Sequence, residues 1–236
     1  MAGNTVWCGT EAEKLYHQSG QFSVTIKDSQ AISVTTGVWS VSYDGTNSPW
    51  TSGDGDKLYL QSGIFSATLK TSQDVNGVDT APTGISWDGT NTPWSGQTAD
   101  KLYLQSGQFS ATLKDSEDVN AIDNVVSGIS WDGTNSPWCG VEADKLYLQS
   151  GQFSATLKDS EGVSGVIVDI SWDGTDTPWA ANVSDKLLLQ SGQFSATIKT
   201  SRSMSGVDSN LLGMDTDDID ARIGAAVTFT PTAVIF

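Results

Sequence analysis

Residues 100–116 read DKLYLQSGQFSATLKDS, and residues 144–160 repeat this stretch without a change. Closely similar stretches occupy residues 56–72 and 185–201, and a looser copy occupies residues 13–29. The leucines that anchor the five copies are Leu15, Leu58, Leu102, Leu146 and Leu187, so the steps between them are 43, 44, 44 and 41 residues. A period this regular predicts an array of one supersecondary unit, and the fold follows from the repeat.

One repeat, taken as residues 83–118, contains four short segments with β propensity. The first, residues 84–87, is β-branched and aromatic and ends in Asp88-Gly89, a strong hairpin signal. A second lies around Trp94, residues 101–105 alternate apolar and polar side chains, and residues 109–114 alternate again. The polar residues 115–123 are expected to connect to the next repeat. No window has helical spacing of apolar residues, so the chain is predicted to be all-β.

Four-stranded units about 40–50 residues apart are typical of the blades of a β-propeller. A β-solenoid is the main alternative, but its coils need only about 20–30 residues. The Pro-Trp motif ends at Trp50, Trp94, Trp138 and Trp179, and Val6-Trp7 is a fifth copy at the start of the chain. The chain therefore begins inside a repeat. We predict a five-bladed β-propeller of four-stranded blades, with the first blade completed by a C-terminal strand.

Residues 203–236 depart from the repeat, and two of their segments are candidates for the closing strand. One is the segment around Met214, and the other is the β-prone run 226–236. We assign residues 1–220 to the five-repeat propeller and residues 221–236 to a closing or anchoring strand. An apolar strand left as a free edge is an aggregation hazard, so the run must be covered or must pair with a partner. The anchoring side chains would be Val227, Phe229, Val234, Ile235 and Phe236.

Composition excludes several classes of partner. The net charge of −16 argues against nucleic acid, whose phosphates require clustered Lys and Arg. No apolar stretch approaches the length of a transmembrane helix, so no membrane insertion is expected. The first residues lack the features of a secretory signal, so any extracellular location would need a non-classical route. Cys8 and Cys139 share a position with Thr51, Ser95 and Ala180, which predicts two buried thiols in separate blades rather than a disulfide.

Motifs for catalysis are absent from the sequence. The single histidine, His17, occupies a position that is Leu in the other repeats, so neither a hydrolytic triad nor a histidine-rich metal site can be assembled. The Asp-Gly-Thr-Asn turns, such as Asp88 to Asn91, offer two or three oxygen ligands each, too few for calcium, and turn chemistry is the alternative reading. We therefore expect no enzymatic activity, no metal and no cofactor.

Two sets of tryptophans are the candidate ligand-binding residues. One set follows the Pro-Trp motif: Trp50, Trp94, Trp138 and Trp179. The other lies at the end of the first segment of three repeats: Trp87, Trp131 and Trp172. Rings of this kind stack on sugar faces, and equivalent sites on several blades would multiply their avidity. Packing between blades is the alternative for both sets.

The sequence Ile129-Ser130-Trp131-Asp132-Gly133 resembles the first strand and hairpin of a generic propeller blade, but no repeat has the paired motifs of the WD40 family. In blade number and size the chain is similar to the tachylectin class of sugar-binding propellers. Its acidic, near-identical repeats with a divergent end also resemble accessory virion proteins of tailed phages. This resemblance implies a structural or attachment protein located in the virion. Its partners would be other virion proteins or copies of itself, joined through the C-terminal strand, and cell-surface glycans. The alternative is a free multivalent lectin, cytoplasmic or extracellular.

Overall fold

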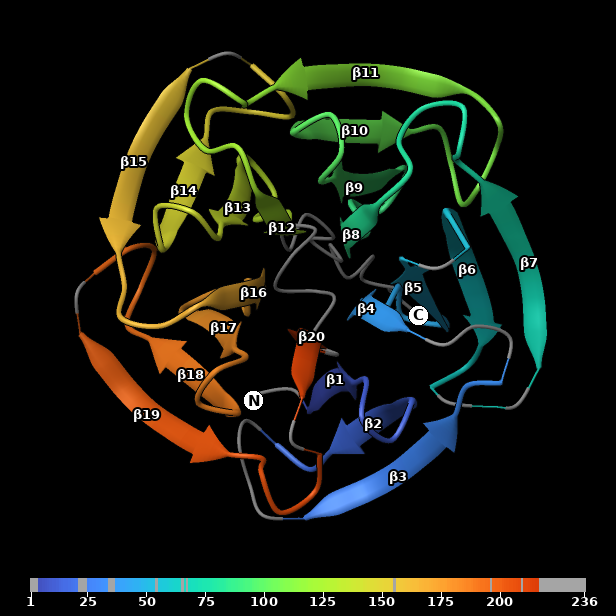
Figure 1. Cartoon of the computed structure of the whole chain (residues 1–236), viewed down its shortest axis with the longest axis vertical. Helices are drawn as coiled ribbons and strands as arrows, with labels where there is room; N and C mark the ends of the chain where they lie inside the picture. The colour runs from blue at the N-terminus through green and yellow to red at the C-terminus, as the bar shows by residue number, and fades with distance from the viewer. Residues whose placement is uncertain are drawn as a thin grey trace, which may run out of the picture.

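The computed structural model describes residues 4–20, 25–33, 37–53, 55–64, 66, 68–154, 156–195, 197–208 and 210–216. Within these ranges the chain forms twenty β-strands and no helix. The strands make five antiparallel sheets of four, arranged as blades around a central axis (Figure 1). The predicted five-bladed β-propeller is confirmed.

Each blade runs from an innermost strand at the axis to an outermost strand at the rim. Blade 1 contains β20 (Leu211–Thr216), β1 (Thr5–Gly9), β2 (Lys14–Gln18) and β3 (Ile26–Ala31). Blade 2 contains β4 (Val38–Val41), β5 (Asn47–Ser52), β6 (Lys57–Ser62) and β7 (Leu69–Asp74). Blade 3 contains β8 (Pro82–Ile85), β9 (Thr92–Gly96), β10 (Lys101–Gln105) and β11 (Leu113–Asp118). Blade 4 contains β12 (Val126–Ile129), β13 (Ser136–Gly140), β14 (Lys145–Gln149) and β15 (Leu157–Gly162). Blade 5 contains β16 (Ile167–Ile170), β17 (Thr177–Ala181), β18 (Lys186–Gln190) and β19 (Ile198–Ser203).

The ring closes within blade 1, where the two ends of the described chain meet. Strand β20 pairs with β1 in antiparallel register, with Met214 opposite Trp7 and Thr216 opposite Thr5. The segment around Met214 is therefore the closing strand. The other candidate, residues 226–236, lies outside the described residues, as do the predicted anchors Val227, Phe229, Val234, Ile235 and Phe236.

The outermost strand differs from its expected position. In blade 3 the alternation of side chains predicts it over residues 109–114, but β11 spans Leu113–Asp118. Phe109 lies instead in the preceding turn, at a φ of 59°, with its side chain buried. Because β11 is an edge strand and largely exposed, its residues need no apolar face, and a polar stretch forms the strand.

The hydrophobic core lies between the blades and forms five clusters, one at each blade-to-blade boundary. At the boundary of blades 3 and 4, for example, Leu102 and Leu104 pack against Ile129 and Trp138. Every cluster draws residues from two adjacent blades. Residues that repeat in the sequence therefore repeat because each blade must fill the same gap against its neighbour.

Candidate ligand-binding sites at the axis and between blades

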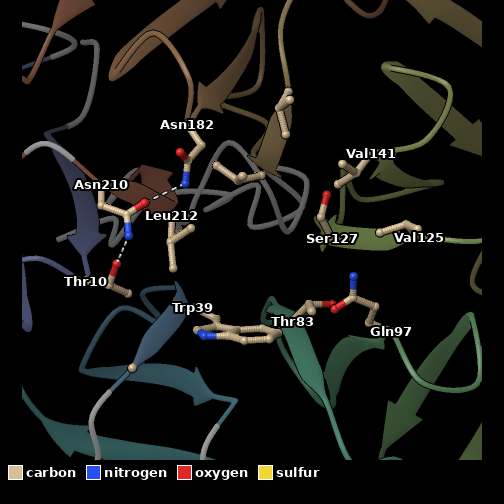
Figure 2. Close-up of a pocket in the computed structure, with 13 residues that line it drawn as sticks. Thr10, Trp39, Thr83, Gln97, Val125, Ser127, Val141, Asn182, Asn210 and Leu212 are labelled. Atoms are coloured by element: carbon tan, nitrogen blue, oxygen red, sulfur yellow. Dashed lines mark hydrogen bonds between the residues drawn. The ribbon is translucent and has the colours of Figure 1, made fainter.

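An open pocket of about 480 Å³ lies on the central axis, and side chains from all five blades line it (Figure 2). Its lining residues are Thr10, Gly37, Trp39, Thr83, Gln97, Val125, Ser127, Val141, Val166, Val168, Asn182, Asn210 and Leu212. None of these side chains is ionisable. The pocket is therefore a neutral cavity of a size typical of small-molecule sites, which measure about 300–1,000 Å³.

A β-bulge in each innermost strand supplies one side chain to the pocket. In blade 2, Val38 pairs with Ser52 and Ser40 pairs with Thr51, so Trp39 is an extra residue between two paired ones. The same shift occurs in the other four blades. The five bulge residues are Trp39, Thr83, Ser127, Val168 and Leu212. A bulge re-aims a side chain out of the regular alternation, which is how these residues reach the axis.

A chain of hydrogen bonds forms the polar side of the pocket across blades 5 and 1 (Figure 2). The Asn182 amide donates to Asn210 Oδ1 at 2.7 Å, and the Asn210 amide donates to the Thr10 hydroxyl. Among the described residues, Asn182 Oδ1 accepts no hydrogen bond and the Thr10 hydroxyl donates none. The chain therefore leaves an acceptor at one end and a donor at the other.

The hydroxyls of two bulge residues are already engaged. Thr83 Oγ1 donates to the backbone oxygen of Val126 at 3.0 Å, and Ser127 Oγ donates to that of Ile167 at 3.2 Å. Each bond joins one blade to the next. The Gln97 side-chain amide, by contrast, makes no hydrogen bond within the described part of the chain, and it lies half-exposed at the pocket.

Two buried carboxylates lie among the residues that follow the bulges on the innermost strands. Asp169 accepts hydrogen bonds from Ser40 Oγ at 2.6 Å and from the Met214 amide at 3.1 Å. Burial raises the pKa of the Asp169 carboxyl well above its ordinary value, and the neighbouring Asp215 charge adds to the rise. Asp215 accepts from Ser42 Oγ and Ser171 Oγ, each at 2.6 Å. These bonds connect blades 5, 1 and 2 around the axis.

The tryptophans of the Pro-Trp motif are buried. Trp50, Trp94, Trp138 and Trp179 expose no more than 1% of their surface. Three of them stack on a tyrosine of the adjacent strand, as Trp50 does on Tyr59 with ring centroids 4.0 Å apart. Their ring faces are occupied by protein, so packing is the role that the structure gives them.

The other three predicted tryptophans, Trp87, Trp131 and Trp172, are half-buried and lie beyond the innermost strands. Trp87 borders a depression of about 410 Å³ between blades 2 and 3, together with Asp44, Thr46, Asn47 and Gln108. The Gln108 amide donates to Asp44 across the two blades. The equivalent bonds Gln152–Asp88 and Gln193–Asp132 recur at the next two boundaries. None of these three tryptophans lines the axial pocket.

The Asp-Gly turns use their carboxylates locally. Asp88 Oδ1 accepts hydrogen bonds from the Thr90 amide at 2.7 Å and from the Asn91 amide at 2.6 Å, and Gly89 has a φ of 93°. Turn chemistry therefore accounts for one carboxylate oxygen of Asp88, while the other oxygen accepts from Gln152 of the next blade. In the part of the chain that is described, no cluster of three or more His, Cys, Asp or Glu side chains is placed to hold a metal ion.

Both cysteines are free and buried, as predicted. Burial raises the pKa of each thiol above its ordinary value. His17 is 8% exposed and lies in β2 between Val6 and Asp28 on the neighbouring strands. No helix formed by the described residues has the length and apolar content to cross a membrane.

Sequence reasoning missed the axial pocket, although the sequence carried a signal for it. The chain has nine tryptophans, and eight of them fall at the two repeated positions. Trp39 is the ninth, and it lies in the pocket. A tryptophan outside the repeat pattern needs an explanation other than repeated packing, and this marks Trp39 as a candidate functional residue.

A scan against protein-family models finds no match, and a search among curated proteins finds none either. Solved structures with the same fold include a chain of the nidogen/laminin complex, with 9% identity and a TM-score of 0.60, covering 91% of this chain and 98% of that one. Glutaminyl cyclase from Myxococcus xanthus matches with 12% identity and a TM-score of 0.54, covering 82% and 76%. A streptogramin B lyase matches with 13% identity and a TM-score of 0.53, covering 85% and 65%. At such identities these likenesses show the propeller fold alone.

The expectation that the chain is not an enzyme is wrong as an inference from its fold and motifs. Two of these three neighbours are named as enzymes, a cyclase and a lyase. The propeller fold is therefore compatible with catalysis, and the absence of familiar sequence motifs does not exclude it.

Proposed function

We propose that this protein recognises a ligand through the axial pocket, with the five blades acting as a rigid frame around it. The observation that carries the proposal is where the repeats differ. The bulge position is Leu212, Trp39, Thr83, Ser127 and Val168 in blades 1 to 5, a different residue in every blade. The position after the second strand is Thr10, Gly53, Gln97, Val141 and Asn182, again with no residue used twice.

Positions with a packing role behave in the opposite way. The second strand carries tryptophan in all five blades, and the third strand carries leucine at the anchoring position in all five. Copies that are otherwise so similar thus differ in every blade at these two positions, and nine of the ten residues line the axial pocket. The same tryptophan or leucine in every blade suits a large side chain that fills the same gap, whereas different residues around the axis suit the different faces of one bound ligand.

A variant that fills the pocket tests this proposal. The double variant Val168→Trp, Asn182→Gly gives blade 5 the two residues that blade 2 has at the equivalent positions, Trp39 and Gly53. The added indole should occupy the cavity while the ring stays closed. Compounds found to raise the unfolding temperature of the native protein should lose that effect on the variant. Compounds that stabilise both proteins equally would place binding elsewhere and refute the proposal.

We further propose that the protein belongs to the virion of a tailed phage, where the propeller would serve in assembly or in attachment to the host surface. The support for this setting is the resemblance of the acidic repeats and divergent end to accessory virion proteins. Immunogold labelling of purified particles tests it: label on tails or capsids is expected, and unlabelled particles would remove the setting without touching the axial site.

A second candidate function, a multivalent lectin, is favoured by the depression at Trp87. An aromatic ring beside Asp44, Asn47 and Gln108 combines a stacking surface with hydrogen-bonding groups, as sugar recognition requires. Replacing Trp87, Trp131 and Trp172 together by Ala should abolish glycan-array binding if these sites are used. Unchanged binding would rule them out.

A further inference from the structure

Among the described residues, Trp39 is the one aromatic side chain that lines the axial pocket, and it is placed as a platform. Trp39 is half-buried in the bulge of β4 and lines the cavity. The six-membered part of its indole lies against Gly53: a Cβ added to that glycine would be 2.4 Å from Trp39 Cε2 and 2.4 Å from Cζ2. One side of the indole is therefore covered by the backbone of its own blade, and the other side borders the cavity.

Among the described residues, the pocket groups that can still form hydrogen bonds are side-chain amides and a hydroxyl. Asn182 Oδ1 is an acceptor and the Thr10 hydroxyl is a donor, at the two ends of the Asn182–Asn210–Thr10 chain. The Gln97 amide offers both a donor and an acceptor from blade 3. Figure 2 shows Asn182 and Asn210 across the pocket from Trp39, with Leu212 between them. A ligand resting on the indole would thus meet hydrogen-bonding groups around its edge.

The electrostatics of the pocket favour an uncharged ligand. Among the described residues, the lining has no ionisable side chain that could pair with a charge. A buried charge without a partner is strongly disfavoured, whereas hydroxyl groups can pair with amides in a neutral site. The chain's net charge of −16 adds a repulsion against anions.

We infer that the axial pocket binds one neutral saccharide ring, with an apolar face of the sugar on Trp39 and its hydroxyls on Asn182, Thr10 and Gln97. A sugar hydroxyl both donates and accepts, which suits a rim that presents a mixture of open donors and acceptors. Amphipathic indole rings offer the flat apolar surface that such a face needs. This inference rests on the proposed function, since it names the ligand class of that same pocket. It also locates sugar binding in the single axial pocket, whose residues differ from blade to blade, and not in the depressions between the blades.

Titration calorimetry on the full chain tests the inference, with neutral methyl glycosides and short neutral oligosaccharides as probes. Trp39→Ala should weaken binding at least tenfold, and Trp39→Phe, which keeps a smaller platform, should weaken it less. Asn182→Ala should also weaken binding. Leu113→Ala is the control, because it removes a large apolar side chain from the exposed edge strand β11, outside the pocket, and it should leave affinity unchanged. Trp87→Ala tests the competing site between the blades. Unfolding temperatures of all variants show whether any loss comes from the fold.

Three other results would each overturn the inference in a different way. Loss of sugar binding in Trp87→Ala but not in Trp39→Ala would move the site between the blades. If charged or purely apolar compounds bind in a Trp39-dependent manner and sugars do not, the ligand class is wrong while the proposed function stands. If no compound from a broad library depends on Trp39 or Asn182, both the inference and the proposed function fail.

Discussion

Replacing Gly128 by Ala tests how closely the innermost strands approach one another. A Cβ at this position would lie 2.4 Å from Asp169 Oδ1 and 2.7 Å from Asp169 Cα. The second atom is backbone, so the clash cannot be relieved by a side-chain rotation alone. Strand β12 or β16 must shift, and the hydrogen bonds that Asp169 accepts from Ser40 and Met214 would shift with it.

The expected cost of Gly128→Ala follows from this overpacking. Forcing an extra carbon into a packed region costs about 1–3 kcal/mol. In a chain of this size each kcal/mol corresponds to about 2–4 °C in Tm, so the variant should unfold about 2–12 °C below the native protein. Thermal unfolding followed by far-ultraviolet circular dichroism measures the change, and a guanidinium titration provides a second reading.

Gly162→Ala is the matched control in the same blade. It lies at the exposed end of β15, where an added Cβ meets nothing within 4 Å. Its effect should stay within about 0.5 kcal/mol, as for ordinary surface changes. Gly84→Ala should resemble Gly128→Ala, since its Cβ would lie 2.7 Å from Gly128 Cα. Equal stability of Gly128→Ala and Gly162→Ala would refute the close approach of blades 4 and 5.

Three further predictions concern buried groups. Asp215→Asn weakens the bonds from the Ser42 and Ser171 hydroxyls and should destabilise the fold by about 1–3 kcal/mol, measured by denaturant titration; an unchanged midpoint would contradict it. Because burial raises the pKa of Asp169, its contribution to stability is complete below the ordinary carboxyl pKa of about 4 and is lost as the pH rises through the folded pKa. The Tm of Asp169→Asn should therefore fall less than the Tm of the native protein as the pH rises from about 4 towards neutrality. If Tm changes with pH in parallel for the two proteins, ionisation of Asp169 does not contribute to the pH dependence of stability. Cys8 and Cys139 are buried with raised thiol pKa values, so Ellman's reagent should label neither in the native protein and both after denaturation.

The architecture was predictable because each repeat obeys the same packing rule. The spacing of Leu15 and its four counterparts predicts the number of blades, and the fifth Trp motif at Trp7 predicts that the chain starts inside a blade. The choice between the Met214 segment and the last residues was not predictable, since both are β-prone. Only the register of β20 against β1 decides it.

The outermost strand was misplaced for a physical reason. Period-two alternation marks a strand with one buried face, and β11 has none, so the alternating residues before it were mistaken for the strand. The left-handed turn at Phe109 carries that side chain into the core from outside any strand.

The axial pocket could not be found from what the repeats share, because it consists of what they do not share. Trp39, Gln97 and Asn182 are each unique at their positions, and a comparison that seeks common residues passes over them. The bulges that bring the side chains to the axis depend on strand pairing, which no local pattern reveals.

The way in which the ring closes also determines how it would respond to a pulling force. Thr5 and Thr216 lie opposite each other at the same end of the β1–β20 ladder. Tension applied between these two residues would load the ladder's hydrogen bonds one after another, as in opening a zipper, rather than all together in shear. Blade 1 would open at low force while β1 kept its pairing with β2. A closed ring can thus be mechanically weak at its seam, and a load applied through residues far from that seam would leave the β1–β20 ladder intact.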